Sequence, residues 1–76
     1  MMKKIKIKIS GADNITRLVE QASLVEEPGV YIHKGKTIID ATSLVGMLAL
    51  DTSQPIIVEF PSSAIDFENY LKEFIF

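Results

Sequence analysis

The sequence is most restrictive in what it lacks: among its 76 residues there are no cysteine, no tryptophan and only one histidine. Without cysteine, the chain cannot be a disulfide-stapled extracellular mini-protein or form a thiolate metal site. Its net charge is −2, whereas most nucleic-acid-binding proteins have an excess of basic residues that contact phosphate. We therefore expect a cytoplasmic protein with no nucleic-acid partner.

Long apolar runs are also missing. No stretch approaches the roughly 20 apolar residues that cross a bilayer, and the isoleucines near the N-terminus alternate with lysines, so they do not form the apolar core of a signal peptide. We expect a soluble protein with no membrane partner. The chain has 47% hydrophobic residues, which is enough for one core, and its length allows one domain, residues 1–76.

Seven stretches have the periodicity of regular secondary structure. Four are expected to be strands, because apolar and polar residues alternate or β-prone residues cluster in residues 4–9, 30–33, 37–40 and 56–60. Gly35 separates the second from the third, which predicts an antiparallel hairpin. The other three stretches have apolar residues at helical spacing, from Ile15 to Ala22, from Leu44 to Leu48 and from Ala64 to Phe74.

The helix starts are predicted from short polar side chains that can accept hydrogen bonds from free amides. The first helix is expected to begin between Gly11 and Asn14, the second after Thr42 or Ser43, and the third after Ser62 or Ser63. In the third helix, Glu68 is placed to pair with Lys72.

This order predicts an α+β protein of arrangement β-α-β-β-α-β-α. We expect a four-stranded antiparallel sheet with three helices on one face, an open-faced β-sandwich, with the other face in solvent through Lys4, Lys6 and Lys8.

The arrangement resembles that of HPr, the histidine-containing phosphocarrier of the bacterial phosphoenolpyruvate-dependent sugar phosphotransferase system. The sequence-specific part of this resemblance is residues 35–48, GKTIIDATSLVGML, where HPr proteins commonly have a Gly-Lys hairpin, an aliphatic strand and a Lys-Ser-aliphatic-Met-Gly start of the second helix. The element order extends the resemblance over nearly the whole chain.

The chemistry of that family lies at the start of the first helix, in a His-Ala-Arg-Pro-Ala stretch. There the histidine is the nucleophile, while the helix terminus and the arginine stabilise the phosphate. In the matching stretch of this chain, Gly11 replaces the histidine and Asp13 replaces the arginine. The resemblance therefore implies a degenerate phosphohistidine site, without the nucleophile and with the opposite charge.

Ser43 matches the serine that a dedicated kinase phosphorylates in HPr of many Gram-positive bacteria. The resemblance implies a regulatory phosphorylation site there, and the alternative is an ordinary helix cap. Thr42 replaces the lysine that usually precedes this serine. Leu44 and Met47 are the candidates for a partner surface, since the interface of the family surrounds this helix; whichever of the two points outward would contribute.

Other candidates have simpler interpretations. His33, the only histidine, is expected to be a solvated hairpin residue, because the sequence shows no group to orient its ring. The lysines near the N-terminus form a basic stripe, interpreted as a solubilising face. No spacing suggests a metal site, a cofactor site or a Ser-His-Asp set.

The leading hypothesis is a non-enzymatic, HPr-like regulatory or protein-binding protein, monomeric or weakly dimeric, similar to catabolite-repression paralogues that lack the active histidine. Its implied partners are HPr kinase, acting on Ser43, and a transcription regulator or metabolic enzyme. Two alternatives stay open: a genuine phosphocarrier with a non-standard acceptor such as His33, and an HPr-fold binding scaffold without phosphorylation.

Overall fold

The computed structural model describes all residues from Met1 to Phe76 and contains four strands, three α-helices and one 3₁₀ helix. In chain order these elements are β1 (Met2–Ile7), α1 (Ala12–Ser23), β2 (Tyr31–Lys34), β3 (Thr37–Asp40), α2 (Leu44–Ala49), β4 (Ile56–Pro61), α3 (Ile65–Leu71) and η1 (Lys72–Phe74). The predicted α+β order is confirmed.

The strands form one antiparallel sheet in the order β1-β4-β2-β3. β2 and β3 form the predicted hairpin, in which Lys34 lies opposite Thr37. Gly35 has a φ of 59° in the turn between them, a conformation that L side chains rarely adopt. β4, the last strand of the chain, lies between β1 and β2 and is therefore in the middle of the sheet.

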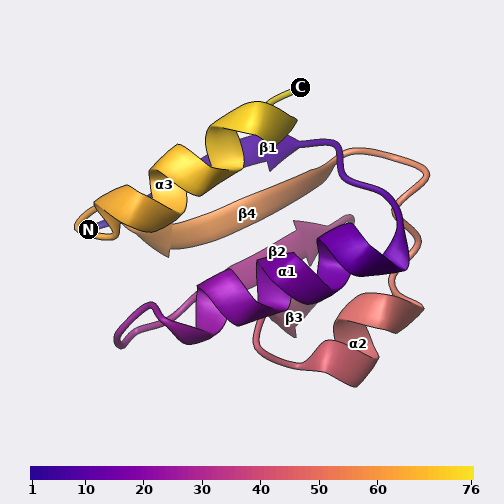
Figure 1. Ribbon diagram of the computed structural model, residues 1–76, viewed down its shortest axis with the longest axis horizontal. Coiled ribbons are helices and arrows are strands. Elements are labelled where there is room, and N and C mark those ends of the chain that lie inside the picture. The colour runs from indigo at the N-terminus through magenta and orange to yellow at the C-terminus, as the bar shows by residue number, and fades with distance from the viewer.

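Buried and more exposed residues alternate along β1 and β4, so one face of the sheet is buried and the other faces solvent. Ile5 lies opposite Val58 and Ile7 opposite Ile56, and this face packs against the helices. Figure 1 shows α1 and α3 side by side over one face of the sheet, with α2 below α1 at the β3 end. Lys4 and Lys6 point from the other face into solvent.

The helices are held by burial more than by capping. α1 buries Ile15, Leu18, Val19 and Ala22, while its N-cap residue, Gly11, makes no side-chain capping bond. The predicted serine cap of α3 was wrong as well: Ala64 is the N-cap residue, and no side chain caps the helix.

The predicted pair between Glu68 and Lys72 was also wrong. Glu68 instead bonds the ammonium group of Lys3 at 2.8 Å. Lys3 lies opposite Phe60, so its side chain leaves β1 on the helix-covered face and reaches α3 there. A contact between residues that are 65 positions apart in sequence thus replaces the predicted local pair.

The C-terminal residues close part of the free edge of β1. The Lys8 amide donates to the Phe74 carbonyl at 2.9 Å, and the Phe76 amide donates to the Lys6 carbonyl at 3.2 Å. Ile75 forms the bridge opposite Ile7. The backbone groups of β1 that these bonds occupy are not open to another strand.

Candidate functional site

The start of α1 is the place where the family resemblance puts the phosphohistidine. Gly11 has a φ of 90° and a ψ of 139°, and its carbonyl accepts the first helical bond, from the Ile15 amide at 3.0 Å. A Cβ added at Gly11 would meet no atom within 4 Å, so the positive φ favours glycine here, whereas crowding does not. The exposed Asp13 lies in the first helical turn. No histidine lies on α1 or just before it.

The start of α2 is built differently. Ser43 is its N-cap residue, and the hydroxyl accepts a long bond of 3.4 Å from the Gly46 amide. Of the two predicted caps it is therefore Ser43 that caps the helix, and the residue is exposed. Thr42 uses its hydroxyl elsewhere, donating to the Asp40 carboxylate at 2.7 Å.

Asp40 fixes the turn that leads into α2. Its Oδ1 accepts bonds from both the backbone amide and the hydroxyl of Thr42, at 2.9 and 2.7 Å. These bonds favour the charged carboxylate, with the amide bond the larger influence, and they lower the pKa of Asp40. The charge beside Ser43 is therefore held in place by the neighbouring backbone.

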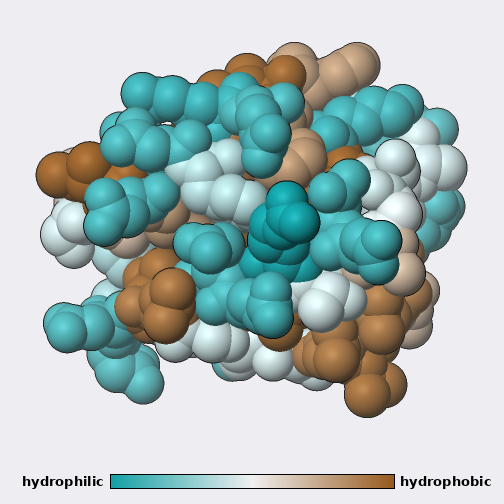
Figure 2. All heavy atoms as spheres, viewed as in Figure 1, coloured by the Kyte–Doolittle hydropathy of each residue, from teal (hydrophilic) through white to brown (hydrophobic).

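Three exposed apolar side chains follow Ser43 on α2. Leu44 is 42% exposed, Val45 82% and Leu48 49%; we call these three residues the α2 patch. Figure 2 shows a hydrophobic area over α2, at the lower right of the view. Exposed apolar side chains that gather in one place are typical of interaction surfaces.

Met47 does not belong to this patch. It is fully buried, so of the two residues proposed for a partner surface only Leu44 reaches solvent. Met47 is the single buried residue of α2 and joins the helix to the core. The prediction that included Met47 in the surface is thus corrected by its burial.

Gly46 allows α2 to approach the sheet closely. A Cβ there would lie 3.2 Å from the Ser43 hydroxyl and 3.3 Å from Cγ2 of Ile39 on β3. Both separations are shorter than ordinary van der Waals contact, so a larger residue would crowd Ser43 and β3. Glycine lowers the intrinsic stability of the helix, but it fits this space.

His33 has an orienting group that sequence reasoning missed. Its Nε2 lies 2.7 Å from Oε1 of Glu59, and both side chains are only about one quarter exposed, at 22% and 24%. The pair forms on the open face, because β2 pairs with β4 and both side chains leave the sheet on that face. The expected hairpin position of His33 is confirmed, but the expectation of a solvated ring without an orienting group was wrong. His33 and Glu59 are 26 residues apart in sequence, so the contact becomes visible only once β2 is paired with β4.

The remaining candidates stay separate. Lys6 and Lys8 hold their ammonium groups 5.5 and 5.7 Å from the Phe76 ring centre, a cation–π arrangement. No group of three or more histidine, aspartate or glutamate side chains is arranged to hold a metal ion. None of the helices is both long and apolar enough to cross a membrane.

No protein-family model, curated protein or solved structure matches this chain at a significant level. The interpretation of the site consequently depends on its own geometry.

Proposed function

We propose that this chain is a cytoplasmic, non-enzymatic regulatory protein of the HPr family that acts by binding other proteins through α2. The observation that supports this most is the position of Ser43: an exposed serine at the N-cap of α2, directly beside the α2 patch. The element order and the resemblance of residues 35–48 to HPr add to it. No cofactor is required.

Phosphorylation of Ser43 would act on this surface by charge. A phosphoserine carries about −1.5 to −2 charges at pH 7. Placed beside Leu44 and Val45, it would make an apolar surface strongly anionic at its border, and Asp40 already contributes a carboxylate in the preceding turn. HPr kinase is the proposed modifying enzyme, and a transcription regulator or metabolic enzyme is the proposed partner whose affinity changes.

The degenerate start of α1 supports regulation over phosphate transfer. A phosphocarrier of the HPr type needs an imidazole at the N-terminus of α1, and this chain has Gly11 there, with the exposed Asp13 in the first turn of the helix. The carboxylate would repel a phosphoryl group. Partner proteins that present a phosphohistidine are therefore not expected to exchange phosphate with this position.

Phosphorylation assays test the proposal directly. The protein is incubated with ATP and HPr kinase, and separately with phosphoenolpyruvate and enzyme I, and its intact mass and fragments are then measured. We expect one phosphate in the kinase reaction, absent in Ser43→Ala and retained in Ser62→Ala, an exposed serine outside α2. A phosphate on any other residue, or none, would contradict the regulatory proposal.

A second candidate function is favoured by the contact between His33 and Glu59. A carboxylate that orients an imidazole is the arrangement used by nucleophilic and general-base histidines, and the 2.7 Å contact engages Nε2 and leaves Nδ1. In this alternative, His33 is a non-standard phosphate acceptor. An acid-labile phosphate in the enzyme I reaction, abolished by His33→Ala, would replace the regulatory proposal. No phosphate in either reaction would leave a binding scaffold without phosphorylation.

A further inference from the structure

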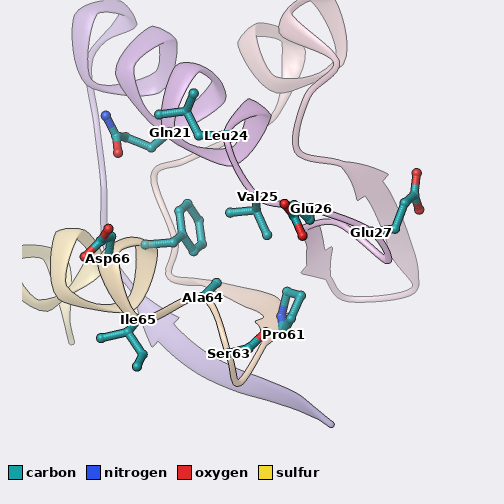
Figure 3. A pocket seen from close by; sticks show the side chains of 11 residues that line it. Gln21, Leu24, Val25, Glu26, Glu27, Pro61, Ser63, Ala64, Ile65 and Asp66 are labelled. Carbon is teal, nitrogen blue, oxygen red and sulfur yellow. The ribbon is translucent and has the colours of Figure 1, made fainter.

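A hollow of about 350 Å³ lies at the far end of α1, between the chain that follows this helix and the turn that leads into α3. Residues 24–27 form one wall, and Pro61 with residues 63–67 forms the other. Figure 3 shows the side chains of Val25 and Ala64 on facing sides of the hollow, with Glu26 toward one end and Asp66 toward the other. It is separate from the α2 patch, which lies on another element.

The charge of the hollow has one sign. Its lining includes Glu26, Glu27 and Asp66 but no lysine, arginine or histidine. Figure 3 shows the Glu27 side chain directed away from the hollow, so Glu26 and Asp66 are the carboxylates that flank it. None of the three carboxylates forms an ion pair or a side-chain hydrogen bond.

Four of the seven other carboxylates have partners. Glu59 contacts His33, Glu68 contacts Lys3, Asp51 accepts from Ser53 and Asp40 accepts from Thr42. Asp13, Glu20 and Glu73 have none, so what distinguishes Glu26 and Asp66 is that two unpaired carboxylates flank one hollow.

Between the carboxylates the lining is apolar. Phe67 is buried behind it, and Val25 and Ala64 are partly buried. Leu24, 76% exposed, and Ile65, 65% exposed, belong to the lining and leave large apolar surfaces in water. A ligand that covered them would gain free energy by removing apolar area from water.

We propose that this hollow is a docking site for a basic segment of a different protein, in which an apolar side chain lies between two lysines or arginines. The apolar side chain would occupy the space between Val25 and Ala64, and the two cations would face Glu26 and Asp66. An acidic or phosphorylated segment is excluded by the same charges. The site is independent of Ser43 and of the regulatory proposal.

A second copy of the chain does not supply the required segment. The pattern of lysines around an apolar residue does occur in residues 4–8, KIKIK, but these form β1 and its end. Ile7 is fully buried and Ile5 packs against the core, so neither side chain is available to another molecule without unfolding. The occupant is therefore a foreign segment.

The test is an NMR titration of the ¹⁵N-labelled full chain with the capped peptide GKLKG. The matched peptides are GELEG, with reversed charge, and GKSKG, without the apolar side chain. We expect saturable shifts of the amides of residues 24–27 and 63–67 with GKLKG, and weaker or no shifts with the other two. The absence of shifts up to about 10 mM peptide, a concentration well above most weak specific affinities, would overturn the proposal.

Two double variants distinguish binding at the hollow from attraction of the peptide to the overall negative charge of the protein. Glu26→Gln with Asp66→Asn is expected to raise the Kd of GKLKG about fivefold or more at low salt, since it removes two exposed ion pairs. Glu20→Gln with Glu73→Gln removes the same charge from exposed positions outside the lining and is expected to raise it less than about twofold.

Three results would contradict the proposal. They are equal weakening by both double variants, shifts confined to α2, and shifts of the lining residues that depend on protein concentration without peptide. The last of these would assign the hollow to self-association.

Discussion

Two neighbouring helices, α1 and α2, distribute their apolar residues in opposite ways. α1 has twelve residues and buries all its large apolar side chains, whereas α2 has six residues and buries only Met47. The capping is reversed too: α1 has no side-chain cap, and α2 is capped by Ser43. Burial thus holds α1 in place, while α2 depends on one anchor and a cap and keeps the α2 patch in solvent. The comparison indicates that α1 contributes mainly to stability, whereas α2 leaves exposed the apolar surface that the proposed binding requires.

The largest expected difference between the helices is the cost of truncating a leucine. Leu18→Ala, on α1, is expected to lower the free energy of unfolding by about 2–5 kcal/mol, because the side chain is fully buried. Leu48→Ala, on α2, makes the same chemical change at a half-exposed position and is expected to cost less than about 1 kcal/mol. Urea denaturation of both variants measures the difference. Equal costs would remove the basis of the comparison.

Within α2, truncation of Met47 and truncation of Leu44 are expected to lower the free energy of unfolding by different amounts. Met47→Ala removes the only buried side chain of α2, and we expect it to cost about 2 kcal/mol or more. Leu44→Ala is expected to cost less than about 1 kcal/mol. If Leu44→Ala were the more damaging change in urea denaturation, α2 would be oriented differently from the arrangement described above.

The capping difference predicts a smaller effect. Ser43→Ala removes the hydroxyl that accepts from the Gly46 amide, and because this bond is long, at 3.4 Å, we expect a loss near the lower end of the roughly 0.5–2 kcal/mol found for caps. Ser10→Ala, just before α1, removes no capping bond and is expected to change stability by less than about 0.5 kcal/mol. Thermal unfolding of the two variants side by side compares these values.

The smallest expected effect is a pH dependence at the entrance to α2. Hydrogen bonds from Thr42 lower the folded-state pKa of Asp40, so the unfolded chain takes up a proton first as the pH falls. The contribution of Asp40 to stability is therefore present near neutral pH and is lost as the pH falls through the unfolded and then the folded pKa, below about 4. Asp40→Asn should weaken the acid dependence of unfolding.

A carboxyl ¹³C titration of Asp40 measures the pKa itself. An unchanged pKa would show that the bonds with Thr42 do not persist in solution.

The parts of the fold that sequence patterns predicted are those with strong local signals. The isoleucines of β1 and the alternation of β4 gave the sheet faces, and Gly35 gave the hairpin. Ser43 was correctly included among the candidate caps of α2. In each case a few consecutive residues determine the conformation, so one sequence contains enough information.

The rest depended on contacts between distant segments. Four apolar residues on the short α2 could not all be buried, and only the packing of this helix against α1 and β3 selects Met47. The contacts of Glu68 with Lys3 and of His33 with Glu59 require the sheet register. The hollow forms only when the end of α1 meets the start of α3, and its carboxylates are 40 residues apart in sequence. No periodicity signals such neighbours.

The distribution of charge over the molecule determines how it is oriented near other charged bodies. The free lysines of β1 lie on the open side of the sheet, and the unpaired carboxylates of the hollow lie with the helices on the other side. The Debye length is about 8 Å at physiological salt, so a charged body that comes close to the protein is affected mainly by the charges of the surface that it approaches. The protein would present β1 to a polyanion and the hollow to a polycation.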